Sequence, residues 1–277
     1  MSKTLHVVIG PTGIGKTDLA IEMAKQFNCP IISADSRQLY NELSIGVAKP
    51  TEEQLKEVKH HFINHISIHQ KYSAGDYAFE ARNKINEIFS NHQHLIVCGG
   101  TGFYIKALIE GLDQLPEENS ELRHTLQKEL KENGIDYLKD KLNSISKYRF
   151  EKTDVENPQR LIRAIEIELN KGMEGEKLPE FEYHFETKYH YMSMDRELLY
   201  DRINKRVDNM IDMGLEQEVK SLIEYKHYNS LNTVGYREWW PYFEGDTNID
   251  FVIDKIKQHS RNYAKRQITW FNHQIKI

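Results

Sequence analysis

The sequence has little cysteine, no long apolar run and no leader-like N-terminus, and each absence excludes a class of protein. Only Cys29 and Cys98 occur among the 277 residues, too few for a disulfide framework or a cysteine-based metal site. Because each lies in an apolar run, we expect two reduced, buried thiols. No apolar stretch reaches the roughly 18 residues of a membrane span, and no signal-peptide pattern precedes the first motif. We therefore expect a cytoplasmic protein without membrane association, and a monomer.

Positive charge is also scarce. The 37 Lys and Arg residues are outnumbered by 42 Asp and Glu, which gives a net charge of −5. This balance argues against general affinity for nucleic acid, which depends on cations that neutralise phosphates. The charges are unevenly placed, because the stretch 255–266 contains basic residues and no acid, whereas 110–121 is rich in acids. The basic stretch is either a solvated helix face or a local surface for phosphates.

The order of apolar patterns predicts an α/β fold: a P-loop parallel sheet flanked by helices, with an inserted all-helical module. Apolar runs at 5–9, 29–34, 95–98 and 189–194 predict strands, and the spacing over 18–27 predicts a helix. Charged helical patterns occupy 120–133, 137–142 and 158–170, and further helices are expected over 196–225 and 250–270. We expect a catalytic core formed by 1–114 and 188–277, and an inserted domain over 115–187.

A glycine-rich motif between the first strand and the first helix predicts a phosphate site. The residues GPTGIGKT at 10–17 match the pattern G-x-x-x-x-G-K-[ST] in its confirming context. Backbone N–H groups of such a loop surround phosphate oxygens, the lysine adds a positive charge, and the threonine can bind Mg²⁺. The motif predicts a diphosphate or triphosphate ligand held by Gly10, Pro11, Thr12, Gly13, Ile14, Gly15, Lys16 and Thr17.

Two other strands end in polar, site-like residues. Asp35-Ser36-Arg37-Gln38 follows one strand, and Gly99-Gly100-Thr101-Gly102 follows another. Because ligands of parallel sheets gather outside the carboxyl ends of the strands, we expect these segments near the glycine loop. The strand over 95–98 lacks the terminal aspartate that holds magnesium in many P-loop NTPases, which disfavours triphosphate hydrolysis. Asp35 is therefore either a base or metal ligand, or the N-cap of a short helix.

Together these pieces resemble one family, the tRNA dimethylallyltransferases of bacterial type. Besides GPTGIGKT at 10–17, the resemblance rests on SADSRQLY at 33–40 and IGVAKP at 45–50. It continues through GGTGFYIKALIEGL at 99–112, NPQRLIRAIEI at 157–167, RINKRVDNMIDMGLEQEV at 202–219, TVGYRE at 233–238 and YAKRQITWF at 263–271. The motifs cover the whole chain in the family's order.

The resemblance implies transfer of a dimethylallyl group from dimethylallyl diphosphate to N6 of adenosine 37, in tRNAs that read codons beginning with U. The glycine loop would then hold the diphosphate of the donor, with Mg²⁺ on Thr17. Asp35 would accept a hydrogen from the adenine amine, Thr101 would assist at the reaction centre, and Arg206 would contact the diphosphate. From the spacing alone, Arg206 could equally form an ion pair on its helix face.

The resemblance also implies a surface for the tRNA anticodon stem-loop. The target adenine must be flipped out of its stack into a channel, and the donor would enter from the opposite end. Arg160 and Arg163 are three residues apart on a helix, which suits contact with phosphates or unstacked bases. The predicted RNA contacts are Asp35, Ser36, Arg37, Gln38, Thr101, Arg123, Gln159, Arg160, Leu161, Ile162, Arg163, Asn232, Gly235, Tyr236, Arg237, Lys265, Arg266 and Gln267.

Two other functions share these features. A small-molecule kinase would have the same loop, sheet and helical insertion, but would bind ATP tightly. An RNA-binding module with a degenerate loop would bind anticodon stem-loops without catalysis. The histidines at 60, 61, 65 and 69 alternate with apolar residues as in a strand, so we do not expect a zinc site there. Trp239 and Trp240 are expected to pack in the core.

Overall fold

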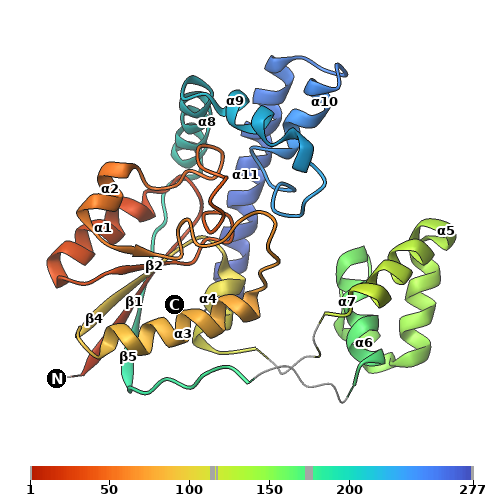
Figure 1. The fold of residues 1–277 in the computed structure, drawn as a ribbon, viewed down its shortest axis with the longest axis horizontal. Coiled ribbons are helices and arrows are strands. Elements are labelled where there is room, and N and C mark those ends of the chain that lie inside the picture. Colours follow the sequence, from red (N-terminus) through yellow and green to blue (C-terminus); the bar gives the residue numbers. More distant parts are fainter. Residues whose placement is uncertain (1, 113–115, 117, 172–176, 276–277) are drawn as a thin grey trace. The chain divides into compact units, whose positions relative to one another are not determined.

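The computed structural model describes residues 2–112, 116, 118–171 and 177–275 (Figure 1). The chain forms two compact units: Met1–Gly111 with Pro179–Ile277, and Leu112–Leu178. The second unit therefore ends earlier than the expected limit at 187. Strand β5 (Phe185–Tyr191) begins before the expected limit, and its first half was not predicted, because charged residues interrupt its aromatic ones there. None of the described helices is long and apolar enough to cross a membrane.

The first unit is built on a five-stranded parallel sheet. Its strands β1 (Lys3–Ile9), β2 (Ile31–Ser33), β3 (His60–His61), β4 (His94–Cys98) and β5 follow the order β3-β2-β4-β1-β5. Val8 and Ser33 are both paired with Cys98, so β1, β2 and β4 end side by side. The predicted α/β fold with a parallel sheet is confirmed, and the three polar segments emerge at one edge.

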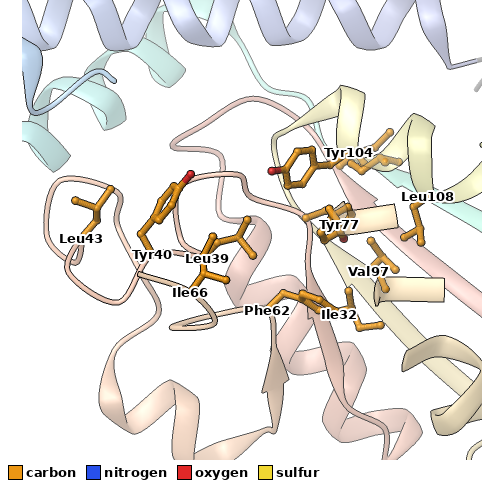
Figure 2. Close-up of a cluster of buried hydrophobic side chains, with 14 of the residues drawn as sticks. Ile32, Leu39, Tyr40, Leu43, Phe62, Ile66, Tyr77, Val97, Tyr104 and Leu108 are labelled. Carbon is orange, nitrogen blue, oxygen red and sulfur yellow. The ribbon is translucent and has the colours of Figure 1, made fainter. Parts of the chain in front are cut away.

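Helices cover both faces of the sheet (Figure 1). Helix α1 (Lys16–Phe27) packs on the face that carries Val8 and Ile96. Helices α3 (Ala74–Phe89) and α4 (Gly102–Ile109) pack on the face that carries Val7 and Val97. Figure 2 shows part of this second core, where the side chain of Tyr77 lies among residues of the sheet and of α4. The alternation of buried side chains along β1 thus anchors both layers.

The C-terminal part of the chain adds helices beside the sheet. They are α8 (Arg196–Asp212), α9 (Leu215–Ser221), α10 (Trp240–Phe243) and α11 (Ile249–Gln274), with 3₁₀ turns at Ile223–Tyr225 and Arg237–Trp239. A short helix α2 (Glu52–Glu57) precedes β3. The predicted helical stretch 196–225 is broken at Gly214, whose φ of 95° is in the left-handed region. Trp239 is fully buried, which confirms its core role.

The second unit is entirely helical where it is described. Helix α5 (Ser120–Ile145) is interrupted at Gly134 and is followed by α6 (Lys147–Lys152) and α7 (Pro158–Leu169). The side chains of Asn119 and Asn157 cap α5 and α7, respectively. A separate apolar core joins α5 to α7 through Leu126, Leu138, Leu142, Leu161 and Ile165. The two predicted helices, 120–133 and 137–142, are confirmed as the two parts of α5, which the non-helical backbone of Gly134 separates; α6 was not foreseen.

The histidine-rich run does not form the strand that its alternation predicts. Strand β3 contains only His60 and His61, after which Phe62 and Asn64 have positive φ values of 65° and 51°. This loop carries His65 to within 2.6 Å of a carboxylate oxygen of Glu80. The histidines are thus dispersed, and the described residues include no group of three potential ligands for a metal ion.

Three other histidines form a cluster on the α1 face of the sheet. The ring of His6 lies between His190, 3.0 Å from its Nδ1, and His94, 3.2 Å from its Nε2. Burial and the two neighbouring imidazoles lower the pKa of His6 to about 4. Protonation would place positive charges side by side in a buried site.

We therefore expect the free energy of unfolding to decrease as the pH falls from about 6.5 towards about 4, by up to about 3 kcal/mol from His6. The sign follows because the unfolded chain takes up this proton at a higher pH than the folded chain. Urea unfolding across this pH range measures the effect. His6→Gln, which keeps a donor and an acceptor, should reduce the slope; an unchanged slope would assign the loss to other groups.

Candidate functional site

The glycine loop connects β1 to α1 and leaves the start of the helix open. Gly10 has a φ of 146°, and a Cβ at this position would lie 2.7 Å from the carbonyl oxygen of Met192. Gly15 occupies the N-cap of α1 in the left-handed region, without a side chain that could bond to the free N–H groups. Such an uncapped helix start favours an anion. The geometry of residues 10–17 is therefore suited to a phosphate group.

Lys16 folds back into this loop. Its Nζ donates hydrogen bonds to the carbonyl oxygens of Gly10, at 3.0 Å, and of Pro11, at 2.8 Å. Burial lowers the pKa of Lys16 to about 8, a shift that the nearby Cys98 and Asp35 oppose. Carbonyl partners leave the charge of the ammonium uncompensated, so the lysine is ready to bind an anion.

This lowered pKa predicts a pH-dependent affinity for a diphosphate. The free protein should bind inorganic diphosphate more weakly above pH 8, because Lys16 loses its charge there, and the loss should approach about tenfold per pH unit. Calorimetric titrations between about pH 7 and about pH 10 test this. Lys16→Arg stays charged over the range and should remove the dependence. A constant affinity in the wild-type protein would contradict a ligand role for a lysine with this lowered pKa.

Arg206, on α8, adds a second positive charge to the loop. Its Nη2 donates to Thr12 Oγ1 at 2.7 Å, and its buried Nε has no hydrogen-bond partner among the described residues. Burial lowers the pKa of Arg206, while Asp35 acts in the opposite direction. Arg206 forms no ion pair within the described parts of the chain, so the alternative of a helix-face pair is wrong. The guanidinium instead donates a hydrogen bond to the glycine loop.

Asp35 and Thr101 meet where β2 and β4 end. Asp35 Oδ1 accepts hydrogen bonds from the backbone N–H groups of Arg37, at 2.9 Å, and Gln38, at 3.3 Å. The capping interpretation is thus correct for one oxygen, although residues 36–39 form turns rather than a helix. Thr101 Oγ1 accepts from Ser36 N at 3.0 Å. These bonds orient the Asp35 carboxylate, and its Oδ2 forms no hydrogen bond within the described residues.

The glycines after β4 explain why no acid stands at the end of that strand. A Cβ on Gly99 would lie 2.2 Å from the carbonyl oxygen of Ala34, because β2 and β4 approach closely there. No side chain, and therefore no magnesium-binding aspartate, fits at this position. Cys98, the preceding residue, is partly exposed rather than buried, and neither cysteine is in a disulfide.

Gln267 is a structural link and not a surface residue. Its Oε1 accepts from Thr12 N at 2.8 Å, and its Nε2 donates to the carbonyl oxygen of Gly100 at 2.9 Å. Since both ends of the buried amide are used within the protein, the predicted RNA contact by Gln267 is wrong. Lys265 and Arg266, its neighbours on α11, are exposed and remain available.

In the segment 232–237, some of the predicted RNA contacts are buried and others are exposed. Gly235 and Tyr236 are buried, and the hydroxyl of Tyr236 donates to Glu218 Oε1 at 2.6 Å, so their predicted RNA contacts are wrong. Asn232 and Arg237 are exposed. Arg37 lies beside this segment, because its Nη1 donates to the carbonyl oxygens of Asn229 and Ser230.

In the helical unit, several predicted RNA contacts serve the fold. Leu161 and Ile162 lie in its apolar core, which rules out RNA contact through their side chains. Arg123 and Arg163 each donate to Oε2 of the fully buried Glu166, both at 2.8 Å. A buried carboxylate requires such neutralisation, so both arginines are partners of Glu166. About 30% of each side chain remains exposed, and their RNA contacts stay predictions. Gln159 and Arg160 are exposed, and Arg160 pairs with Asp154 at 3.0 Å.

An apolar cavity of about 260 Å³ lies beside the glycine loop. It is lined by Pro11 of the loop and by Tyr191, Ser193, Met194, Leu199, Ile268 and Asn272. Apart from Pro11, none of these residues was predicted, because their side chains come from β5, the segment after it, α8 and α11, and meet only in the folded chain. The cavity gives the loop an apolar neighbour that could bind a hydrocarbon group.

Known proteins resemble this chain along its whole length. A protein-family model described as IPP transferase matches residues 38–274. A tRNA dimethylallyltransferase of Christiangramia forsetii is 45% identical, with 100% of this chain and 93% of that protein covered. The tRNA dimethylallyltransferase of Flavobacterium psychrophilum is 42% identical, with 96% and 90% covered.

Two solved structures extend the comparison to the fold. The tRNA isopentenylpyrophosphate transferase of Bacillus halodurans has a TM-score of 0.72 at 33% identity, covering 99% of this chain and 88% of that one. A eukaryotic dimethylallyltransferase acting on tRNA has a TM-score of 0.79 at 25% identity, covering 98% and 70%. Sequence and fold agree, and the chain belongs to the IPP transferase family.

Proposed function

We propose that this protein transfers a dimethylallyl group from dimethylallyl diphosphate to N6 of adenosine 37, in tRNAs that read codons beginning with U. Its relatives are tRNA dimethylallyltransferases. One observation carries the proposal: the cationic Lys16 and Arg206 lie at the glycine loop and interact electrostatically with Asp35, and the apolar cavity adjoins Pro11 of the same loop. A prenyl diphosphate needs both an anion site and an apolar site, and the loop and the cavity beside it offer both.

The donor's diphosphate would bind to the open start of α1 and to Lys16 and Arg206, with its hydrocarbon part in the cavity beside Pro11. In this arrangement the protein stabilises the negative charge of the leaving group. A small-molecule kinase is the second candidate. The close approach of Gly99 and Ala34 disfavours it, because this contact leaves no room for the aspartate that usually holds a nucleotide's magnesium.

The residues present suit a magnesium ion that the diphosphate brings with it. Mg²⁺ keeps most of its waters and needs only one or two protein ligands beside phosphate oxygens. The described residues contain no cluster of three metal-binding side chains, and Thr17 offers a hydroxyl in the first turn of α1. We assign Thr17 as the protein ligand. The ion would supply positive charge to the leaving diphosphate.

The acceptor chemistry would depend on Asp35. The lone pair of an exocyclic amine is delocalised into the ring, so N6 is a poor nucleophile. As the bond from N6 to C1 of the donor forms, the bond from C1 to the diphosphate oxygen breaks, and N6 loses a proton. The Asp35 carboxylate, held through Oδ1 by two backbone N–H groups, would accept that proton. Thr101, which accepts a hydrogen bond from Ser36, would lie beside the flipped base.

The RNA contacts retained in the proposal are partly or fully exposed. They are Ser36, Arg37, Gln38, Thr101, Arg123, Gln159, Arg160, Arg163, Asn232, Arg237, Lys265 and Arg266. The proposal places the reaction in the cytoplasm, with the protein acting as a monomer on the anticodon stem-loop.

Two parallel titrations separate the two candidate functions. Dimethylallyl diphosphate and ATP are each titrated into the protein with Mg²⁺, and ATP hydrolysis is followed in parallel. We expect the prenyl diphosphate to bind more tightly, with no turnover of ATP. Tighter binding of ATP with release of phosphate would support the kinase and contradict the transferase.

A further inference from the structure

Glu218, on α9, connects two segments that border the site. Its Oε2 accepts a hydrogen bond from Ile45 N at 2.8 Å, and its Oε1 accepts from Gly46 N at 3.1 Å. The hydroxyl of Tyr236 donates to the same Oε1 at 2.6 Å. One carboxylate thus binds two consecutive N–H groups of the loop 45–48 and a side chain of the segment 229–237. Hydrogen bonds to a charged acceptor are about twice as strong as neutral ones.

The packing around this carboxylate leaves little freedom. A Cβ on Gly46 would lie 2.5 Å from Cε2 of Tyr236, and one on Gly235 would lie 3.0 Å from the carbonyl oxygen of Gly46. The tyrosine ring therefore rests directly on the backbone of the loop. Burial and the charge of Glu218 raise the pKa of Tyr236, so its hydroxyl remains a donor. The two segments are held in a single relative position.

Both segments in turn hold the backbone that carries Asp35. Gln38 Nε2 donates to the carbonyl oxygen of Ala48 at 3.0 Å. Arg37 Nη1 donates to the carbonyl oxygens of Asn229 and Ser230 at 3.2 and 3.3 Å. The backbone N–H groups of these same two residues, Arg37 and Gln38, bind Asp35 Oδ1. Hydrogen bonds and the short backbone segments between them therefore connect Glu218 to the carboxylate.

We propose that Glu218 is a positioning residue for the transfer reaction: it fixes the loop 45–48 and the segment 229–237, and through them the orientation of Asp35. This inference rests on the proposed function. Without the carboxylate, two backbone N–H groups lose their acceptor, and the loop can shift. Small displacements of a reacting group are costly, because a misplacement of about 1 Å can lower a rate about a hundredfold.

The test uses Glu218→Gln, because the amide keeps the size of the side chain but presents a donor to one of the two backbone N–H groups. We expect the single-turnover rate of prenyl transfer, at saturating tRNA and donor, to fall by at least about tenfold. The dissociation constant of dimethylallyl diphosphate should stay within about twofold of wild type, because Lys16 and Arg206 are untouched. Tyr236→Phe removes only the hydroxyl and should show a smaller loss of the same kind.

Glu216→Gln is the matched control. Glu216 lies on the same helix and also accepts from a tyrosine, Tyr242, at 3.3 Å, but the described structure shows no bond from it to the loop 45–48. It should transfer at the wild-type rate. Rates are compared at a temperature where circular dichroism shows each variant folded, and if Glu218→Gln does not fold, Tyr236→Phe decides. Wild-type rates in the folded variants, or losses equal to that of the control, would overturn the proposal. No transfer by the wild-type protein would instead refute the proposed function.

Discussion

Asp35→Asn should lower the rate of prenyl transfer by about a thousandfold, which is within the range expected for loss of a general base. The substitution keeps Oδ1 as an acceptor for the N–H groups of Arg37 and Gln38. The local turn should therefore be preserved while the negative charge disappears. A single-turnover assay with labelled donor and unmodified tRNA measures the rate. Binding of tRNA, followed by fluorescence anisotropy, should remain within about threefold of wild type.

Asp76→Asn provides the control for this loss. Asp76 is also a capping residue, since its Oδ2 accepts from Ser73 N at 2.7 Å, but it is exposed at the start of α3. It should transfer at the wild-type rate. If Asp35→Asn were as active as this control, the carboxylate would have no part in the chemistry.

The second large effect is expected at Arg206. Arg206→Met should weaken binding of dimethylallyl diphosphate by about a hundredfold, because one of two cations beside the glycine loop is lost. The midpoint of thermal unfolding should not fall, since the guanidinium has no ion-pair partner among the described residues and its Nε is unsatisfied. Calorimetric titration and thermal unfolding measure the two quantities on the same sample.

Together, the two measurements distinguish a residue that serves ligand binding from one that serves folding. Arg196→Met, at the exposed start of α8, is the control and should change neither quantity. A large loss of stability in Arg206→Met, with donor affinity unchanged, would show that Arg206 supports the fold only.

The parts of the site that were predictable are those that lie on continuous sequence. The loop 10–17 and the segments after β2 and β4 follow apolar runs directly, and parallel pairing brings strand ends together. Asp35, Thr101 and Lys16 could therefore be placed near one another without a structure. Strand β5 was predicted only in its second half, because its alternating charges follow from partial exposure of both faces.

The errors concern side chains whose neighbours are distant in sequence. Helical spacing placed Arg160 and Arg163 on one face, but it could not reveal that Glu166, three residues after Arg163, is fully buried by distant residues and takes that arginine as a partner. Gln267 lies in a basic stretch typical of an RNA-binding surface, yet the two ends of its amide join the glycine loop to the end of β4. Tyr236 is similarly buried, and its hydroxyl donates a hydrogen bond to Glu218. Such assignments require the folded neighbours.

The central claim is that this site joins a dimethylallyl group to adenosine in tRNA. The most direct measurement is mass spectrometry of the nucleosides from unmodified tRNA after incubation with the protein, Mg²⁺ and dimethylallyl diphosphate. The account predicts dimethylallyl adenosine at position 37 with the wild-type protein, and almost none with Asp35→Asn. Unmodified adenosine after incubation with a folded wild-type protein that binds both substrates would contradict it.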